Sequence, residues 1–184
     1  MFQGLTFYPK TKLVDRVSPG LFARSTWNFD GEMKQQSVEG WVNANLAGQT
    51  FARVFYSVGR EQFRDVEFEG IRRFGSVLES SFSRALSLGA FFGTGRSIAR
   101  NLSTPVLGNA TDLELWGTLR PHSQLSISPS FRYSELSHRD GGPEIFSGYI
   151  LRTRADLQFS REFFLRMVVQ YNDFGQTLDL EPLL

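Results

Sequence analysis

The chain has 184 residues, a formal net charge of +1, no cysteine and a high count of 18 phenylalanines. This length suits one ordinary domain, and the lack of cysteine excludes a disulfide scaffold and any thiolate metal site. Charges of both signs are mixed along the chain, so nothing in the charge pattern favours nucleic acid as a partner. No run approaches the roughly 20 apolar residues that a membrane-spanning helix needs.

Stretches that alternate apolar and polar side chains recur along the chain, and this period of two is typical of strands. Turn-forming residues separate the stretches, and no segment has a convincing helical pattern. We therefore expect an all-β protein whose strands, in chain order, span 2–8 (weakly), 20–29, 37–46, 50–60, 74–82, 85–94, 111–120, 124–134, 147–159, 163–172 and 176–184.

The connections between these strands are alternately short and long. The short ones are AGQ, SR, PHS and SRE, and the long ones are expected as external loops near 30–36, 61–73, 95–110 and 135–146. Outer-membrane barrels sort their connections in this way, whereas a β-sandwich with Greek-key crossings has no reason to do so. The sequence thus predicts one domain over 1–184, an antiparallel up-and-down transmembrane β-barrel or a partial barrel of about ten or eleven strands.

One face of the expected strands is apolar, with large rings near the strand ends and small aliphatic side chains between them. Amphipathic rings favour the headgroup level of a bilayer, whereas a soluble core would place its largest rings centrally. The rings are Trp27, Phe29, Tyr56, Phe92, Tyr133, Tyr149 and Tyr171 toward the long loops, and Phe82, Phe159 and Phe163 toward the short turns.

The other face is polar and carries charges of both signs, which stabilise a sheet when they lie opposite each other on neighbouring strands. The hairpin around PHS is expected to place Asp112 opposite Arg132, and the hairpin around SRE to place Asp156 opposite Arg166. An acidic side chain of the last strand should approach Arg166 from its other side. The candidates for ion pairs in the barrel lumen are Asp112, Glu114, Arg132, Arg152, Arg154, Asp156, Arg166, Asp179 and Glu181.

Aromatic side chains also fall on this polar face, namely Trp41, Phe55, Phe91 and Trp116. Rings in a polar lumen can stack on sugars, which would make a saccharide a partner. Alternatively they fill the lumen, as side chains do in small barrels.

No residue pattern indicates catalysis. The sequence HRD at 138–140 lacks the glycine-rich loop, strand lysine and DFG that accompany it in kinases. His122 and His138 are far apart and lack metal-ligand spacing. No nucleophile with a positioned base is visible, so we expect no enzymatic activity, no metal and no cofactor.

Several stretches are similar to the C-terminal barrel region of a family of uncharacterised bacterial proteins: FEGIRRFG at 68–75, SRALSLG at 83–89, LRPHSQLSISPSFRYSEL at 119–136, HRDGG at 138–142 and the final segment 159–184. In that family a domain similar to family 9 carbohydrate-binding modules precedes an outer-membrane barrel. The resemblance implies a bacterial outer-membrane location and a barrel fragment, since the carbohydrate-binding domain is absent and the family continues into another hairpin.

We also expect that this chain does not close a barrel alone. Its last alternating run, Leu178, Leu180, Pro182 and Leu184, lacks the terminal aromatic that commonly ends such barrels. Unpaired edge strands are unfavourable in lipid, so further strands of the same protein or an adjacent chain should cover the edges.

The expected role is that of a passive pore or envelope scaffold in contact with membrane lipid. The alternative is a soluble all-β carbohydrate-binding module, whose apolar face would pack on a second sheet.

Overall fold

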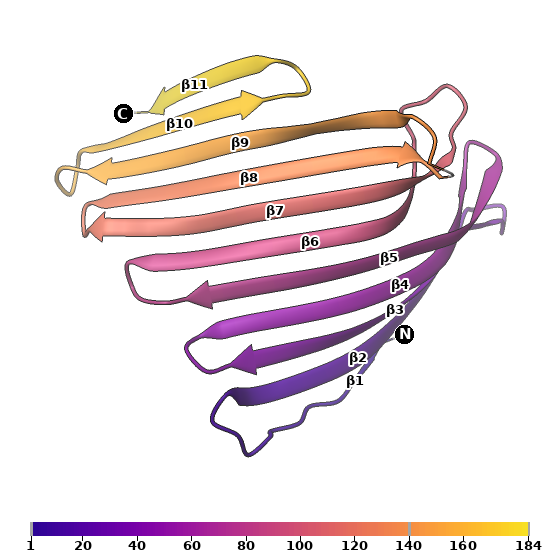
Figure 1. The fold of residues 1–184 in the computed structure, drawn as a ribbon, viewed down its shortest axis with the longest axis horizontal. Coiled ribbons are helices and arrows are strands. Elements are labelled where there is room, and N and C mark those ends of the chain that lie inside the picture. The colour runs from indigo at the N-terminus through magenta and orange to yellow at the C-terminus, as the bar shows by residue number, and fades with distance from the viewer. Residues whose placement is uncertain (1, 140, 184) are drawn as a thin grey trace.

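The computed structural model describes residues 2–139 and 141–183. These residues form a single antiparallel sheet of eleven strands whose spatial order follows the chain (Figure 1). The expected all-β meander is thereby confirmed. The strands are β1 (Phe2–Gly4), β2 (Val14–Trp27), β3 (Met33–Leu46), β4 (Thr50–Phe63), β5 (Val66–Ser81), β6 (Leu86–Ile98), β7 (Leu107–His122), β8 (Leu125–His138), β9 (Glu144–Gln158), β10 (Phe164–Asn172) and β11 (Thr177–Leu183).

The sheet is open, because β1 and β11 lie at its two edges and do not pair with each other. The described strands therefore do not close into a barrel. This agrees with the expectation from the sequence. Among the described residues, no helix is long and apolar enough to cross a membrane. Asp140 of the HRD sequence and Leu184 of the last alternating run lie outside the described residues.

The loops are shorter than expected, because the strands continue into polar sequence. The predicted loop at 61–73 is wrong: β4 and β5 are joined by Arg64 and Asp65 alone. Polar side chains on both faces of this segment suggested a loop, but its backbone groups pair with each other, as in Glu61 opposite Phe68. The other three predicted loops shrink to 28–32, 99–106 and 139–143. Connection length thus distinguishes the two ends of the sheet less than expected.

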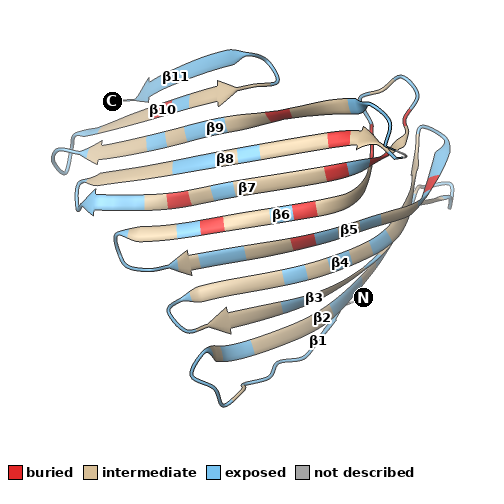
Figure 2. Cartoon of the chain, viewed as in Figure 1, coloured by how far each residue is buried: buried red, intermediate tan, exposed pale blue. Residues whose placement is uncertain are grey.

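The strand register joins apolar side chains into one continuous face. Val42 lies opposite Val54 on the neighbouring strand, and Leu115 lies opposite Phe131. These side chains are far from buried: Leu78 is 52% exposed and Leu151 is 47% exposed. Figure 2 shows the same result for the whole sheet, where few positions are buried. No second layer among the described residues covers this apolar face.

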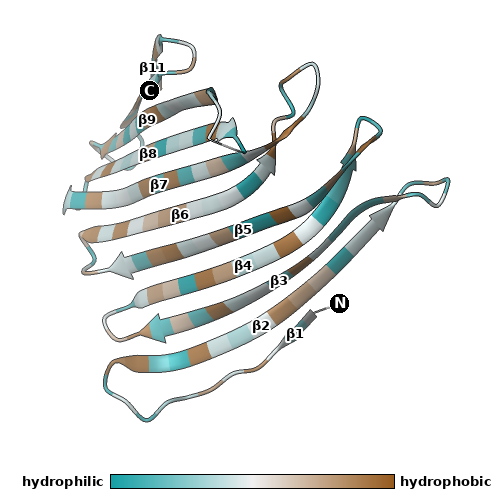
Figure 3. Ribbon diagram, turned by 45° about the vertical axis from the view of Figure 1, so that its right-hand side comes forward, coloured by the Kyte–Doolittle hydropathy of each residue, from teal (hydrophilic) through white to brown (hydrophobic). Residues whose placement is uncertain are grey.

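The sheet is bent, as Figure 3 shows, and side chains converge on its polar side. Phe55 on β4 stacks with Phe91 on β6, with ring centroids 6.5 Å apart. Arg73 on β5 forms an ion pair with Asp112 on β7. Each contact skips one strand, although strands two apart lie about 10 Å from each other in a flat sheet. The polar face is therefore concave.

Candidate functional site

The candidate site is this concave polar face. Because side chains alternate between the two sides of a strand, the register places every candidate ion-pair residue and all four candidate rings together on it. The polar face comprises Glu39, Trp41, Asn43, Arg53, Phe55, Arg73, Phe91, Asp112, Glu114, Trp116, Arg132, Arg152, Arg154, Asp156, Arg166, Asp179 and Glu181.

Asp112 does not pair with Arg132, so that prediction is wrong. The turn lies at Ser123 and Gln124, later in the chain than the expected PHS, because β7 continues to His122 and pairs there with Leu125; this displaces the register, so that Asp112 lies opposite Ser134. Arg132 instead lies opposite Glu114, and the two side chains form an ion pair of 2.8 Å. Asp112 accepts a hydrogen bond of 2.9 Å from the Ser134 hydroxyl in addition to its ion pair with Arg73.

The prediction that Asp156 lies opposite Arg166 is confirmed. The Arg166 Nε donates to Asp156 Oδ1 at 2.6 Å, and Arg154 Nε lies 2.8 Å from the other carboxylate oxygen. One carboxylate therefore holds two guanidinium groups.

No acidic side chain of β11 lies opposite Arg166, so the third expected pairing is wrong. The connection between β10 and β11 sets a register in which Arg166 lies opposite Leu183. Asp179 lies opposite Gln170, and Glu181 lies opposite Val168. Neither acid has an ion-pair partner among the described residues.

Arg152 is also without an ion-pair partner in the described part of the chain. It lies between Ser130 and Gln170 on the neighbouring strands. Together with Trp116 and Arg132, these side chains line a hollow of ≈ 340 Å³ on the polar face. The charges of the polar face therefore include both ion pairs and groups without an ion-pair partner.

The aromatic side chains of the polar face lie on glycines. A Cβ atom added to Gly75 would lie 2.2 Å from the Phe55 ring, and one added to Gly89 would lie 2.2 Å from the Trp116 ring. Both distances are far below contact distance, so only glycine leaves room for these rings. The same holds for Trp41 over Gly20 and for Phe91 over Gly93. The rings thus cover backbone that has no side chain of its own, which is a filling role.

Arg53 completes the cluster of rings at β3–β6. Its guanidinium carbon lies 5.5 Å from the Trp41 ring and 5.4 Å from the Phe55 ring, within the range of a cation–π contact. The same group donates to Glu39 at 2.7 Å. The sequence did not identify Arg53 and Glu39 as a pair, because nothing local to either strand fixes the register between them.

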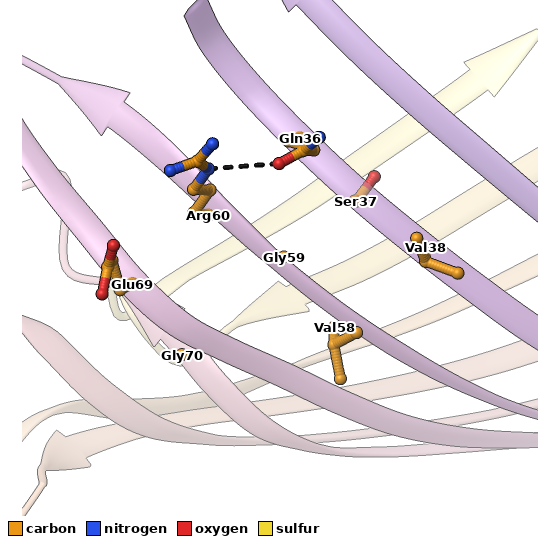
Figure 4. A pocket seen from close by; sticks show the side chains of 8 residues that line it. All are labelled: Gln36, Ser37, Val38, Val58, Gly59, Arg60, Glu69 and Gly70. Atoms are coloured by element: carbon orange, nitrogen blue, oxygen red, sulfur yellow. Dashed lines mark hydrogen bonds between the residues drawn. The ribbon is translucent and has the colours of Figure 1, made fainter.

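The apolar face changes character toward the loops. In Figure 4, Val38 and Val58 lie side by side, and next to them Arg60 donates to the Gln36 side chain at 3.2 Å. Arg60 also lies 3.5 Å from Glu67. Gln36, Val38, Val58 and Arg60 line a pocket on the apolar face. At this pocket, aliphatic side chains are replaced by charged and amide groups.

The chain matches no protein-family model, no curated protein and no solved structure. The similarity to the C-terminal barrel region of a bacterial family, drawn from turn and strand sequences, stays a prediction.

Proposed function

We propose that the chain forms a large part of the wall of a transmembrane β-barrel in a bacterial outer membrane, acting as a passive pore or as a scaffold for envelope partners. The observation that carries this proposal is the continuous apolar face, which is exposed along the sheet while charges gather on the concave side. In a soluble sheet protein a second layer covers such a face. Exposed apolar patches larger than a few hundred Å² mark interaction surfaces.

The run of apolar side chains along single strands is a second observation that supports lipid as the partner. On β4, the outward side chains from Ala52 to Val58 are apolar, and Arg60 follows. Seven residues span about 20 Å along the strand at the usual rise. With the usual strand tilt of about 40° this gives a band about 15 Å high, which fits within the roughly 25 Å apolar band of outer-membrane barrels.

Rings at the loop end of the same face give further support. Tyr149 lies opposite Tyr133, and its ring centroid is 5.8 Å from that of Tyr171. Aromatic rings gathered near one edge of an apolar band are typical of the headgroup level.

The open edges require a partner within this proposal. An unsatisfied backbone group in hydrocarbon is unfavourable by several kcal/mol. We infer that further strands of the same protein, or those of an adjacent chain, lie beside β1 and β11.

Single cysteines test the orientation of the sheet, because the natural chain has none. Leu115→Cys and Leu151→Cys place a label on the apolar face, and Ser130→Cys places a matched label on the polar face. After reconstitution into vesicles that contain brominated lipid, we expect a fluorophore at the first two positions to be strongly quenched and one at the third to be little affected.

Equal quenching on both faces would contradict the orientation. A protein that stays monodisperse in buffer without detergent would contradict membrane residence and favour the soluble alternative.

A further inference from the structure

We propose that the connection between β6 and β7, residues 99–106, is a latch that folds over the polar face and narrows the interior at the loop end. This inference rests on the proposed function as a pore, because a latch matters only where solutes pass. Figure 1 shows this connection, called the latch loop below, at the same end of the sheet as the β4–β5 hairpin.

An apolar cluster anchors the latch loop to the polar face. Ala99 is fully buried and packs with Ala110 of β7 and Leu136 of β8, which are 7% and 4% exposed. Leu102 and Val106 of the loop pack against this cluster, as does Phe146 of β9. By register, Ala110, Leu136 and Phe146 continue the polar face of their strands, so the loop leans inward.

Polar contacts tie the opposite side of the latch loop to the β4–β5 hairpin. The Arg100 guanidinium lies 2.7 Å from the Glu61 carboxylate and 4.8 Å from the centre of the Phe63 ring. The hydrogen bond with Glu61 raises the pKa of Arg100 above its ordinary value. Arg64 in the hairpin turn donates to the Leu102 carbonyl at 3.3 Å.

A second inward contact lies beside this anchor. Phe174, in the connection between β10 and β11, packs edge-on against Phe146 with ring centroids 6.1 Å apart. Its ring lies over Gly148, where an added Cβ atom would be 2.7 Å from the ring. Phe146 is therefore held between the cluster at the latch loop and the last hairpin.

These contacts span the sheet from β4 to β9. The eight residues of the latch loop contact β4 at one end and β8 and β9 at the other, on the concave side of the sheet. Within the proposed pore, a solute that crosses the interior at this end passes the loop. The two attachments differ in kind, since the anchor is apolar and buried whereas the tie to Glu61 is polar and partly exposed. Release of the tie is thus the easier way to open the latch.

Variants of the tie test this proposal in planar bilayers. Glu61→Gln removes the charge that holds Arg100, so we expect a severalfold rise in single-channel conductance or in the fraction of time spent open. Glu32→Gln is the matched control. It breaks a surface ion pair of 2.9 Å with Lys34 at the same end of the sheet and has no contact with the latch loop.

A reversible lock gives the complementary test. In Glu61→Cys/Arg100→Cys, a short bifunctional methanethiosulfonate should join the two thiols, lower the conductance to the wild-type level or below, and lose this effect when a reductant cleaves the link. Absence of the cross-link, or conductance that neither the variants nor the link change, would overturn the latch.

Failure of the pore itself is distinguishable from failure of the latch. Chains whose apolar face is quenched by brominated lipid, and which conduct equally in all forms, would retain the proposed function and lose the latch. Chains that are not quenched and do not conduct would lose both.

Discussion

At the scale of single residues, the carboxylate of Asp156 is the most heavily used charge on the polar face. It is 25% exposed, and its two partners Arg154 and Arg166 are 47% and 41% exposed. Solvent therefore screens both pairs, and each should contribute on the order of 0.5 kcal/mol. Removal of the shared carboxylate affects both guanidinium groups, whereas removal of one arginine leaves the other in place.

We therefore expect Asp156→Asn to lower the free energy of unfolding by about 1 kcal/mol and Arg166→Ala by about half as much. The measurement is the midpoint of thermal unfolding in detergent, followed by heat-modified gel mobility. Asp179→Asn is the control, since that acid has no ion-pair partner among the described residues and should leave the midpoint unchanged. If Arg166→Ala is the more damaging variant, the carboxylate is not the shared centre of the cluster.

The sequence predicted which residues lie on the polar face, but only some of the ion pairs between them. Alternation alone assigns a residue to a face, so Asp112, Glu114 and Trp116 could be placed together in advance. Partner choice depends on register, and the turn after β7 lies at Ser123 and Gln124 instead of at PHS, which changes it. Arg73 was not predicted as the partner of Asp112 because the expected loop at 61–73 includes it, and because its contact skips a strand, which only the bend of the sheet makes feasible.

At the scale of elements, the β4–β5 hairpin shows why loops were harder to predict than strands. Arg64 and Asp65 form its two-residue turn with φ angles of 49° and 61°. Such left-handed pairs suit type I′ turns, for which Asn-Gly is the strong sequence signal. The pair Arg-Asp gives no such signal, so the polar residues that flank it predicted a long loop.

Substitutions at Asp65 should report on this turn. Asp65→Val places a β-branched side chain at positive φ and should lower the free energy of unfolding by about 1 to 2 kcal/mol. Asp65→Gly removes the steric conflict and should raise it by about 0.5 kcal/mol, while Asp65→Asn should be neutral. Chemical denaturation of the three variants in detergent gives these values. A tolerant response to Val would mean that 64–65 is not a tight turn.

At the scale of the whole molecule, the sheet has one apolar face, one polar face and two open edges. β11 is exposed throughout, from Thr177 to Leu183. On the side away from β3, the described residues that pair with β2 are the short β1, Leu5, whose amide donates to the Pro19 carbonyl, and Phe7, which bridges to Val17. What pairs with the edges could not be predicted, because register and partner are properties of the assembled sheet.

Hydrogen exchange of the protein in bilayers tests whether the edges are covered. In an antiparallel strand, the bonds to one neighbour involve alternate residues, so the free side of β11 carries about half of its amides. Lipid offers these amides no acceptor, and we therefore expect all amides of Leu178–Glu181 to be protected as strongly as that of Val169 in β10. Alternate fast and slow amides in the bilayer would show an uncovered edge, and the inferred partner strands would then be wrong.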